Sequence, residues 1–335
     1  MRPLSITVLM GGTSAERDVS LASGLRIVDA LCERGHSVVA LDPAAGVLDE
    51  AALRELRARG VGVEPPALEA LAELRGRALS TDFAQRPEVR SADVVFLALH
   101  GGAGEDGTVQ ALLDMAGVRY TGSGHLASAL AMDKELSKIL FRAAGVRTAD
   151  WLMAPQPAPL VAETLGWPVV VKPSKQGSTV GLTIVREDAG LEAAVAEAFR
   201  YDDEVMIERF IPGRELTVGV LGDDAFPVGE IIPRKEIYDY ECKYTAGMAT
   251  EVFPADLPPA IASELQEQAL RAFRALKLRG CARVDFRMTG AGECYCLEAN
   301  TLPGMTALSL IPQGAAAAGM SFGDLCERIV QLALG

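Results

Sequence analysis

Two short apolar runs, each ending at a pair of glycines, restrict most strongly what this chain can fold into. Ile6–Met10 leads into Gly11-Gly12, and Ala92–Leu99 leads through His100 into a second glycine pair. Apolar runs of this length are typical of strands buried in a parallel sheet. Glycines directly after such strands let the backbone approach a ligand closely.

Helix and strand patterns alternate around these runs. A helix is predicted around Val19–Arg34 and a further strand over Ser37–Leu41, whereas the Ala- and Glu-rich segment Leu48–Arg77 indicates surface helices. Alternation of this kind favours a doubly wound α/β sheet with ligands at the carboxyl ends of its strands. We expect this organisation over the first third of the chain.

The pattern changes after about Tyr120, where strands and helices no longer alternate. Helices are expected over Leu126–Ala144, Gly190–Arg200 and, as an amphipathic closing helix, Phe322–Leu334. Strands are predicted at Val169–Lys172, Val205–Glu208, Leu216–Leu221, Arg283–Met288 and Glu293–Leu297. This mixture indicates one or two α+β domains. A long irregular loop is expected over Ile232–Phe253, and such loops in compact proteins are more often functional than idle.

The acidic composition argues against several classes of partner. The 335 residues carry 45 acidic and 32 basic side chains, a formal net charge of −13, so nucleic acid and anionic membrane surfaces are disfavoured. No apolar run approaches the roughly 18–20 residues of a membrane span, and no signal peptide is evident. The six cysteines are dispersed, and Cys294-x-Cys296 lacks metal-site spacing. We therefore expect a cytoplasmic protein with reduced, structural thiols.

The turn after the first strand has two interpretations. Thr13-x-x-Glu16 fits a capping box at a helix start, or the turn carries Glu16 to a ligand. Neither glycine cluster supplies the Gly-x-Gly-x-x-Gly fingerprint of a dinucleotide site. The missing fingerprint argues against a nicotinamide-dependent dehydrogenase.

A lysine-rich turn follows a second buried strand. The segment Lys172-Pro-Ser-Lys-Gln-Gly177-Ser178-Thr179-Val180-Gly181 can present backbone N–H groups and a lysine to an anion, or can form a plain hairpin turn. It is not a Walker A sequence. Lys134, in Met132-Asp-Lys, lies at a helix start, where a cation is unfavourable unless an anion shares the site.

The most informative cluster lies near the end of the chain. Strand alternation places Arg283 and Asp285 on one face, and Glu298 and Asn300 on one face of the next strand. If the two strands pair, two carboxylates and an amide oxygen converge beside an arginine. Such oxygen ligands suit Mg²⁺ that bridges nucleotide phosphates. A surface salt-bridge ladder is the alternative, and the apolar flanks argue against it. Gly304 then offers a backbone N–H at a sharp turn.

These segments, taken in order, resemble the D-alanine–D-alanine ligases, which are ATP-grasp carboxylate–amine ligases. The resemblance runs from Ile6 to the C-terminal helix and is thin only over about 43–90 and 154–166. The matching motifs are Gly11-Gly-Thr-Ser-Ala-Glu-Arg, His100-Gly-x3-Glu-Asp-Gly, Tyr120-Thr-Gly-Ser-Gly, Met132-Asp-Lys, Lys172-Pro-Ser-x2-Gly-Ser, Tyr238-Asp-Tyr-Glu-x-Lys-Tyr244, Arg283-Val-Asp and Glu298-Ala-Asn-Thr-x-Pro-Gly-Met-Thr. Ile237 departs from the aromatic residue that is usual there.

The resemblance implies an ATP-grasp fold and a nucleotide site. The expected domains are an N-terminal substrate-binding domain (1–122), a central domain with a Gly-rich lid loop (123–207) and a C-terminal domain with the metal site and a mobile loop (208–335, loop 232–253). ATP would lie between the last two domains. The residues that match its contacts are Lys134, Lys172 and Gly177 at the phosphates, Glu208, Arg209, Phe210 and Ile211 at adenine, and Glu215 at ribose. Asp285, Glu298 and Asn300 match the ligands of two Mg²⁺ (or Mn²⁺) ions.

The resemblance also implies a reaction, the joining of two D-alanine molecules at the expense of ATP for peptidoglycan precursor synthesis. The matching residues are Glu16 and His100 at the first D-alanine, Arg283 and the Gly304 N–H at the oxyanion, Ser309 and Leu310 at the second carboxylate, and Tyr244, Ser178 and Glu16 in the closing network. Lys243 matches a substrate-binding residue, and Lys243-Tyr244 lies at the position whose identity separates dipeptide from ester-forming ligases. The family suggests a homodimer. Alternatives are a D-alanine–D-lactate ligase of the same family and a catalytically silent nucleotide-binding regulator. The regulator is disfavoured because no metal ligand or lysine is missing.

Overall fold

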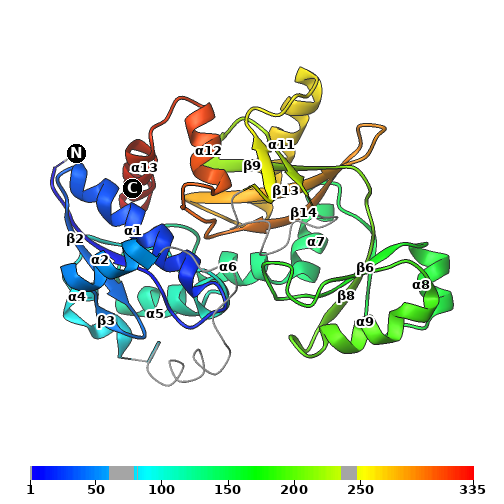
Figure 1. The fold of residues 1–335 in the computed structure, drawn as a ribbon, viewed down its shortest axis with the longest axis horizontal. Coiled ribbons are helices and arrows are strands. Elements are labelled where there is room, and N and C mark those ends of the chain that lie inside the picture. Colours follow the sequence, from blue (N-terminus) through cyan, green and yellow to red (C-terminus); the bar gives the residue numbers. More distant parts are fainter. Residues whose placement is uncertain (1, 60–78, 81, 235–246) are drawn as a thin grey trace.

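A computed structural model of the chain describes residues 2–59, 79–80, 82–234 and 247–335. Within them three sheets form, each covered by helices and linked by the chain in sequence order (Figure 1). The predicted α/β start and α+β remainder are both confirmed.

The first sheet has the order β3-β2-β1-β4. Its strands are β1 (Ser5–Leu9), β2 (Ser37–Asp42), β3 (Gly46–Val47) and β4 (Val94–Leu97), and its helices are α1 (Arg17–Glu33), α2 (Glu50–Arg59), α4 (Pro87–Arg90) and α5 (Thr108–Ala116). β1 pairs in parallel with both β2 and β4, and only the short β3 is antiparallel. The carboxyl ends of β1 and β4 therefore meet, which brings the two glycine turns together.

The second sheet has the order β5-β8-β6-β7 and is antiparallel. It comprises β5 (Trp151–Met153), β6 (Val169–Pro173), β7 (Thr183–Val185) and β8 (Val205–Arg209), with helices α8 (Ala158–Thr164) and α9 (Leu191–Ala198). Both helices share one apolar core with β6 and β8. The lysine-rich turn joins β6 to β7, which pair antiparallel, and so forms the connection of a hairpin.

The third sheet has the order β12-β11-β9-β13-β14, with β10 beside β9. Its strands are β9 (Arg214–Leu221), β10 (Asp224–Ala225), β11 (Gly229–Pro233), β12 (Ala249–Val252), β13 (Cys281–Met288) and β14 (Cys294–Asn300). Alternate residues of β13, such as Val284 and Phe286, are buried in a core shared with α6 (His125–Met132), α7 (Lys134–Ala143) and α11 (Pro259–Ala275). The opposite face of β13 is therefore free to carry polar side chains.

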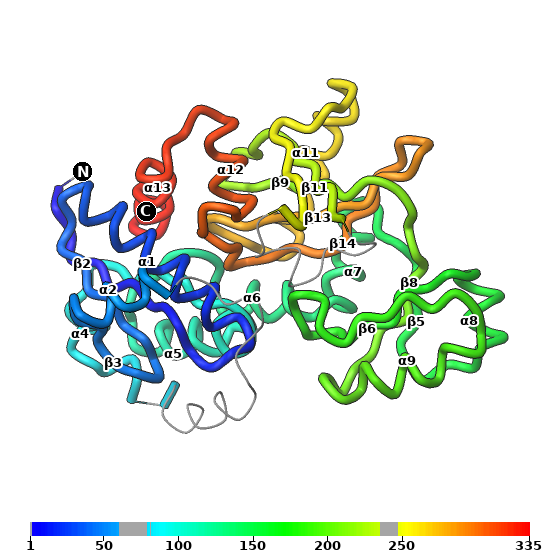
Figure 2. Tube along the Cα trace, viewed as in Figure 1, coloured from blue at the N-terminus to red at the C-terminus, as the bar shows by residue number. Residues whose placement is uncertain are grey.

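The end of the chain returns to its beginning. After α12 (Leu310–Ala317), helix α13 (Phe322–Leu334) packs beside α1 in a common core that includes Leu25, Leu31 and Ile329. Figure 2 shows these C-terminal helices between the N-terminal part and the third sheet. The amphipathic closing helix is confirmed at its predicted bounds. Short 3₁₀ turns lie at Phe83–Gln85, Gly102–Gly104 and Asp188–Gly190.

Two sequence predictions differ from the structure. The single helix expected over Leu126–Ala144 is two helices, because Asp133 is extended and its side chain accepts a hydrogen bond from the Leu136 N–H as an N-cap. The irregular loop expected over Ile232–Phe253 begins and ends in strand, since β11 and β12 pair across it. The predicted helices of Leu48–Arg77 are present as α2 as far as Arg59, and residues 60–77 lie outside the described residues.

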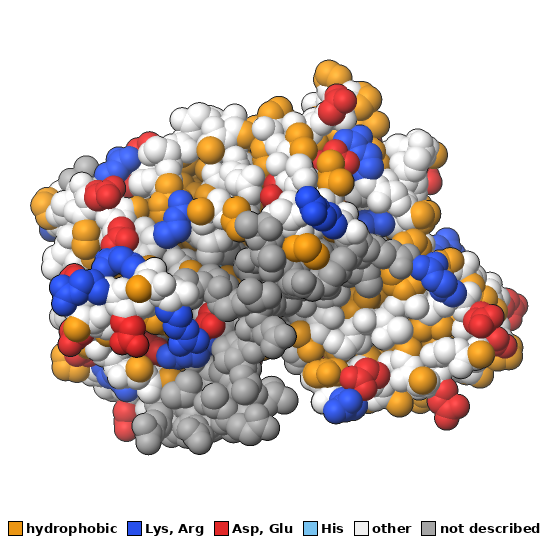
Figure 3. Space-filling model, in the orientation of Figure 1, with side chains coloured by type: hydrophobic (Ala, Val, Ile, Leu, Met, Phe, Trp, Pro, Cys, Tyr) orange, Lys and Arg blue, Asp and Glu red, His pale blue; other side chains and the backbone are white. Residues whose placement is uncertain are grey.

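Acidic and basic side chains are interspersed over the described surface in Figure 3. Within the described ranges no helix is both long and apolar enough to cross a bilayer.

Candidate active site

Two adjoining cavities lie where the three sheets approach one another. The first is lined by residues of all three parts of the chain, among them Glu16, His100, Arg283 and Ser309. The second lies between the second and third sheets, and includes Lys172, Glu208 and Glu215. The residues that line both are Lys134, Gln176, Gly177, Ser178, Arg283, Glu298 and Leu310. A ligand in one cavity can therefore react with a ligand in the other.

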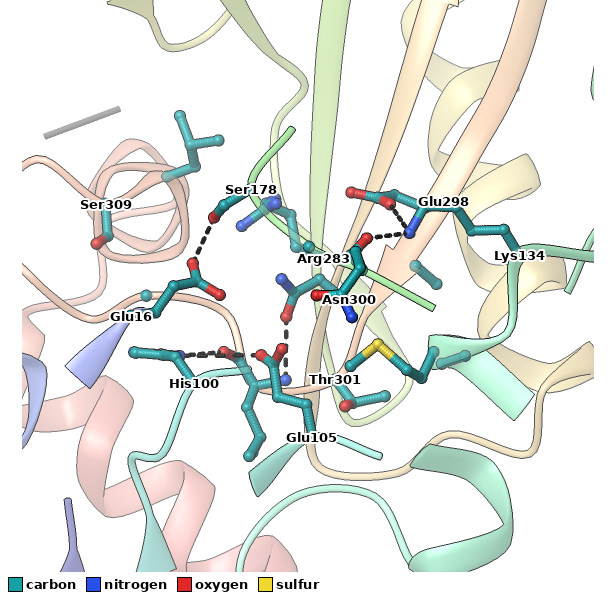
Figure 4. Close-up of a pocket in the computed structure, with 18 of the residues that line it drawn as sticks. Glu16, His100, Glu105, Lys134, Ser178, Arg283, Glu298, Asn300, Thr301 and Ser309 are labelled. Carbon is teal, nitrogen blue, oxygen red and sulfur yellow. Dashed lines mark hydrogen bonds and ion pairs between the residues drawn. The ribbon is translucent and has the colours of Figure 1, made fainter. Parts of the chain in front are cut away.

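Glu16 lines the first cavity. It is the N-cap of α1 and its side chain makes no cap hydrogen bond, so the capping-box interpretation is wrong. Instead Glu16 Oε1 accepts a hydrogen bond of 2.5 Å from Ser178 Oγ (Figure 4). Ser178 and Thr179 have φ of 51° and 65°, a conformation that costs non-glycine residues energy and is concentrated at functional sites. The β6–β7 loop thus contacts the N-terminal glycine turn.

Hydrogen bonds and an ion pair hold the glycine turn that carries Glu16. Arg17 donates to the Gly12 carbonyl at 2.5 Å and pairs with Asp42 at 2.5 Å, and Asp42 accepts the Gly12 N–H at 3.2 Å. Asp42 is fully buried. The Gly12 N–H is therefore occupied within the protein, which further disfavours a dinucleotide at this turn.

His100 joins the end of β4 to the turn after β14. Its Nδ1 lies 2.8 Å from the Leu302 carbonyl oxygen and 3.9 Å from Glu105 Oε1. Burial lowers the pKa of the imidazole, but the hydrogen bond and charge of Glu105 outweigh burial and raise the pKa above its ordinary value. Burial raises the pKa of the Glu105 carboxyl. Both side chains are buried and line the first cavity together with Glu16.

The polar face of β13 and β14 forms the wall between the cavities. Asp285 lies directly opposite Glu298, and Arg283 directly opposite Asn300, so the predicted pairing of these strands is confirmed. Arg283 Nη2 is 2.8 Å from Asp285 Oδ2, and Lys134 Nζ is 3.3 Å from Glu298 Oε2. Like charges facing each other across a sheet are unfavourable unless cations lie between them.

This donor set fits a divalent cation of the magnesium type. It offers two carboxylates and an amide oxygen, the hard ligands that Mg²⁺ prefers. The described part of the chain contains no group of three or more His, Cys, Asp or Glu side chains arranged to hold a metal, so Asn300 or a substrate oxygen would have to complete the site. Asn300 Oδ1 already accepts the Leu302 N–H at 3.1 Å, and an amide oxygen has a second lone pair.

The turn after β14 lines the floor of the first cavity. A Cβ on Gly304 would come within 2.7 Å of Ser309 Oγ, so only glycine fits there without a shift. Ser309 Oγ accepts the Thr306 N–H at 2.9 Å. Gly304, Ser309 and Leu310 all face the same cavity as Arg283, which places a backbone N–H and a guanidinium within one enclosure.

A buried lysine–glutamate–lysine cluster lies at the second cavity, which two of its members, Lys172 and Glu208, line. Lys172 Nζ is 2.7 Å from Glu208 Oε2, and Lys138 Nζ pairs with Glu208 Oε1. Burial alone would raise the pKa of Glu208, but the charges of the two lysines outweigh it and lower the pKa to about 2. Burial lowers the pKa of Lys138, against the attraction of Glu208.

The lowered pKa of Glu208 predicts a pH effect on stability. A carboxyl whose folded pKa lies below its unfolded value of 4.5 stabilises the fold above that value, and this stabilisation is lost as pH falls towards 2. We expect the free energy of unfolding of the Glu208→Gln protein to fall less steeply than that of the unchanged protein between about pH 4.5 and pH 2. Urea unfolding at several pH values measures this, and parallel curves would contradict it.

The far end of the second cavity carries the predicted adenine and ribose residues. Phe210 and Ile211 follow β8, and Glu215 lies in β9 opposite Arg287. Arg287 Nη1 is 3.2 Å from Glu215 Oε2, and its Nε donates to the Ile211 carbonyl at 3.1 Å. Arg209 lines the same cavity, but its guanidinium donates to the Leu165 carbonyl at 3.2 Å.

Sequence reasoning missed two residues of this region. Lys138 follows Lys134 by one helical turn, and Arg287 follows Asp285 at the strand period, so each shares a face with a predicted site residue. The predicted residues Lys243 and Tyr244, and with them Ile237, lie outside the described residues.

Family comparisons cover nearly the whole chain. Residues 5–123 match the family description "D-ala D-ala ligase N-terminus", and residues 140–331 match "D-ala D-ala ligase C-terminus". A D-alanine–D-alanine ligase of Citrifermentans bemidjiense is 44% identical over 99% of this chain and 97% of its own length. One of Geobacter sulfurreducens is 45% identical over 98% and 94%.

Solved structures agree with these relatives. The D-alanine–D-alanine ligase of Coxiella burnetii superposes with a TM-score of 0.82 at 30% identity, covering 100% of this chain and 94% of that one. A D-Ala:D-Ser ligase of Enterococcus faecalis gives 0.81 at 28% identity, covering 99% and 100%. The fold is therefore ATP-grasp. This chain belongs to the D-alanine–D-alanine ligase family.

Proposed function

We propose that this protein is an ADP-forming ligase that joins two D-alanine molecules to D-alanyl-D-alanine with ATP, through a D-alanyl phosphate, for peptidoglycan precursor synthesis. Membership of the D-alanine–D-alanine ligase family supports this activity. The observation that carries it is the wall shared by the two cavities, where Arg283, Lys134 and Glu298 face both. A nucleotide phosphate on one side can there meet a carboxylate on the other.

In the first step a carboxylate oxygen of the first D-alanine bonds to the γ-phosphorus of ATP, and ADP leaves. Both reactants are anions, so their approach needs positive charge at the shared wall. Lys134, Lys172 and Arg283 supply it, while Glu16 holds the ammonium group of this D-alanine near His100. The backbone of Gly177 approaches the phosphates from the β6–β7 loop.

In the second step the amine of the second D-alanine bonds to the carbonyl carbon, and phosphate leaves. The oxygen of the tetrahedral intermediate gains charge, and Arg283 with the Gly304 N–H stabilises it. Ser309 and Leu310 receive the carboxylate of the second substrate at the helix α12 end of the cavity. The attacking nitrogen gives up one proton to solvent as the neutral amide forms.

Asp285, Glu298 and Asn300 would hold the metal ions. When bound, Mg²⁺ or Mn²⁺ neutralises charge on the phosphates and orients them for in-line transfer. The adenosine part of the nucleotide would contact Glu208, Phe210, Ile211 and Glu215. Arg209 would contact it through backbone atoms, because its side chain donates to the Leu165 carbonyl.

Acyl phosphates hydrolyse, so water has to be kept from the site. The Ser178–Glu16 hydrogen bond supports a lid formed by the β6–β7 loop, and the segment 232–253 is proposed as the second lid. We further propose the domains 1–122, 123–207 and 208–335, a homodimer in solution, and a cytoplasmic location, where ATP is available.

The test is phosphate release from ATP measured with D-alanine, D-lactate and L-alanine. We expect release with D-alanine, formation of D-alanyl-D-alanine, and little use of D-lactate as acceptor. Release without D-alanine, or a preference for D-lactate, would overturn the proposal in favour of a nucleotide hydrolase or a D-alanine–D-lactate ligase.

Tyr244→Phe should raise the share of D-alanyl-D-lactate made from mixed substrates. The family resemblance implies that Tyr244 would link to Ser178 and Glu16, and leaving a buried partner of a lost hydroxyl unpaired costs roughly 1–3 kcal/mol. That loss falls on the closed site, which selects the second substrate. Mass spectrometry measures the ratio of the two products. Tyr201→Phe, at a partly exposed site, is the control. An unchanged product ratio in Tyr244→Phe would contradict the closing network.

A further inference from the structure

Lys138 is a buried cation that the proposed reaction does not use. Its side chain has 0% exposure, although lysine is among the residues least often buried completely. Its Nζ pairs with Glu208, donates to Thr148 Oγ1 at 2.7 Å and lies 5.1 Å from the Trp151 ring centroid. Burying an ion is unfavourable unless a partner and hydrogen bonds compensate it, so this position needs an explanation.

The partner of Lys138 already has another lysine. Glu208 forms an ion pair with Lys138 through Oε1 and another with Lys172 through Oε2, and its side chain is 4% exposed. Lys172 lines the nucleotide cavity, whereas Lys138 does not. Two lysines share one carboxylate, so the cluster carries one net positive charge, and of its two lysines it is Lys172 that lines the cavity.

We infer that Lys138 is a positioning residue whose charge neutralises Glu208, so that the charge of Lys172 remains available to the phosphates of the nucleotide. Without Lys138, Glu208 and Lys172 form a neutral pair beside the phosphate site. With Lys138 the cluster presents one net positive charge to the cavity. The inference rests on the proposed function only in taking the ligand to be a nucleoside triphosphate held by Lys172.

The hydrogen bonds of Lys138 also tie both walls of the nucleotide cavity together. Thr148 Oγ1, which accepts from Lys138, donates to the Cys296 carbonyl of β14 at 2.8 Å. Glu208 belongs to β8 of the second sheet, so Lys138 connects the strand of Glu208 with the strand of Glu298. Loss of the side chain can therefore alter geometry as well as charge, and the test has to separate the two effects.

A charge series makes that separation. Lys138→Met removes one positive charge from the cluster, Glu208→Gln removes the negative charge, and the double variant restores the original net charge without Lys138. For each, the dissociation constants of ATP and of adenosine are measured by calorimetry at fixed ionic strength and Mg²⁺ concentration. The ratio of the adenosine constant to the ATP constant isolates the contribution of the phosphates from that of the adenine contacts.

We expect this ratio to fall on the order of tenfold in Lys138→Met, the scale of one charge acting over several ångströms at an effective dielectric constant of about 20. In the double variant it should return close to the original value, and in Glu208→Gln, where the cluster gains a further net positive charge, it should exceed that value. Lys277→Met changes the protein's net charge equally at an exposed position after α11, and should leave the ratio unchanged.

A purely structural role gives a different pattern. Lys138→Met would then weaken ATP and adenosine equally, or the double variant would remain as weak as Lys138→Met; either result overturns the inference. If Lys138→Met fails to fold, a ratio in Glu208→Gln no higher than in the double variant overturns it as well. If the unchanged protein binds no ATP, the proposed function fails instead, so the two failures are distinguishable.

Discussion

Glu298→Gln is expected to abolish dipeptide formation, lowering the rate by on the order of 10³-fold or more, the scale on which phosphoryl transfer depends on its charge-stabilising groups. Glu298 faces Asp285 across the sheet and pairs with Lys134 at 3.3 Å. The amide keeps the shape of the side chain but removes the charge that a divalent cation needs. We expect thermal stability close to that of the unchanged protein.

Binding of Mn²⁺ with ADP, followed by electron paramagnetic resonance, separates metal loss from other causes and should weaken together with activity. Glu293→Gln is a matched control, because Glu293 lies just before the same strand, is 52% exposed and forms a surface ion pair with Arg147. Full activity in Glu298→Gln would remove this residue from the metal site.

Arg283→Met is expected to lower the turnover number by about 10²–10³-fold, the typical cost of losing one oxyanion donor. ATP binding should change far less, because Arg283 stands at the shared wall and is held by Asp285 through Nε and Nη2 at 2.9 and 2.8 Å. Steady-state kinetics with each substrate varied in turn provide the measurement.

Arg287→Met supplies the comparison on the same face of β13. Arg287 lines only the nucleotide cavity among the two described, and contacts Glu215 and the Ile211 carbonyl. We expect its loss to raise the KM for ATP with a much smaller effect on turnover. If Arg283→Met instead weakened ATP binding and kept its turnover, Arg283 would belong to the phosphate site.

Local patterns predicted much of this site. Strand alternation alone placed Arg283 and Asp285 on one face of their strand, and Glu298 and Asn300 on one face of theirs. In the structure the two strands pair, with Asp285 opposite Glu298 and Arg283 opposite Asn300. Alternation could not reveal the irregularity after Asp285, where Phe286 pairs with Cys296 and Leu297 is passed over. Such bulges depend on how two strands meet in space.

Contacts between distant segments were harder to predict. Ser178 and Glu16 are 162 residues apart, and only family resemblance connected them. The burial of Lys138 was missed because a lysine in an amphipathic helix usually faces solvent. The helix predicted over Leu126–Ala144 ran through the break at Asp133, although Lys134 was also placed at a helix start, where α7 does begin. A single N-cap aspartate decides this boundary between two nearly continuous helix-forming stretches.

If the carboxylate of D-alanine attacks the γ-phosphorus of ATP, one carboxylate oxygen must leave with the phosphate. With D-alanine labelled by ¹⁸O in both carboxylate oxygens, mass spectrometry of the released phosphate should find one labelled oxygen per phosphate, in amounts equal to the D-alanyl-D-alanine formed. Phosphate that carries no label from D-alanine, while dipeptide accumulates, would contradict the acyl-phosphate reaction at the shared wall of the two cavities.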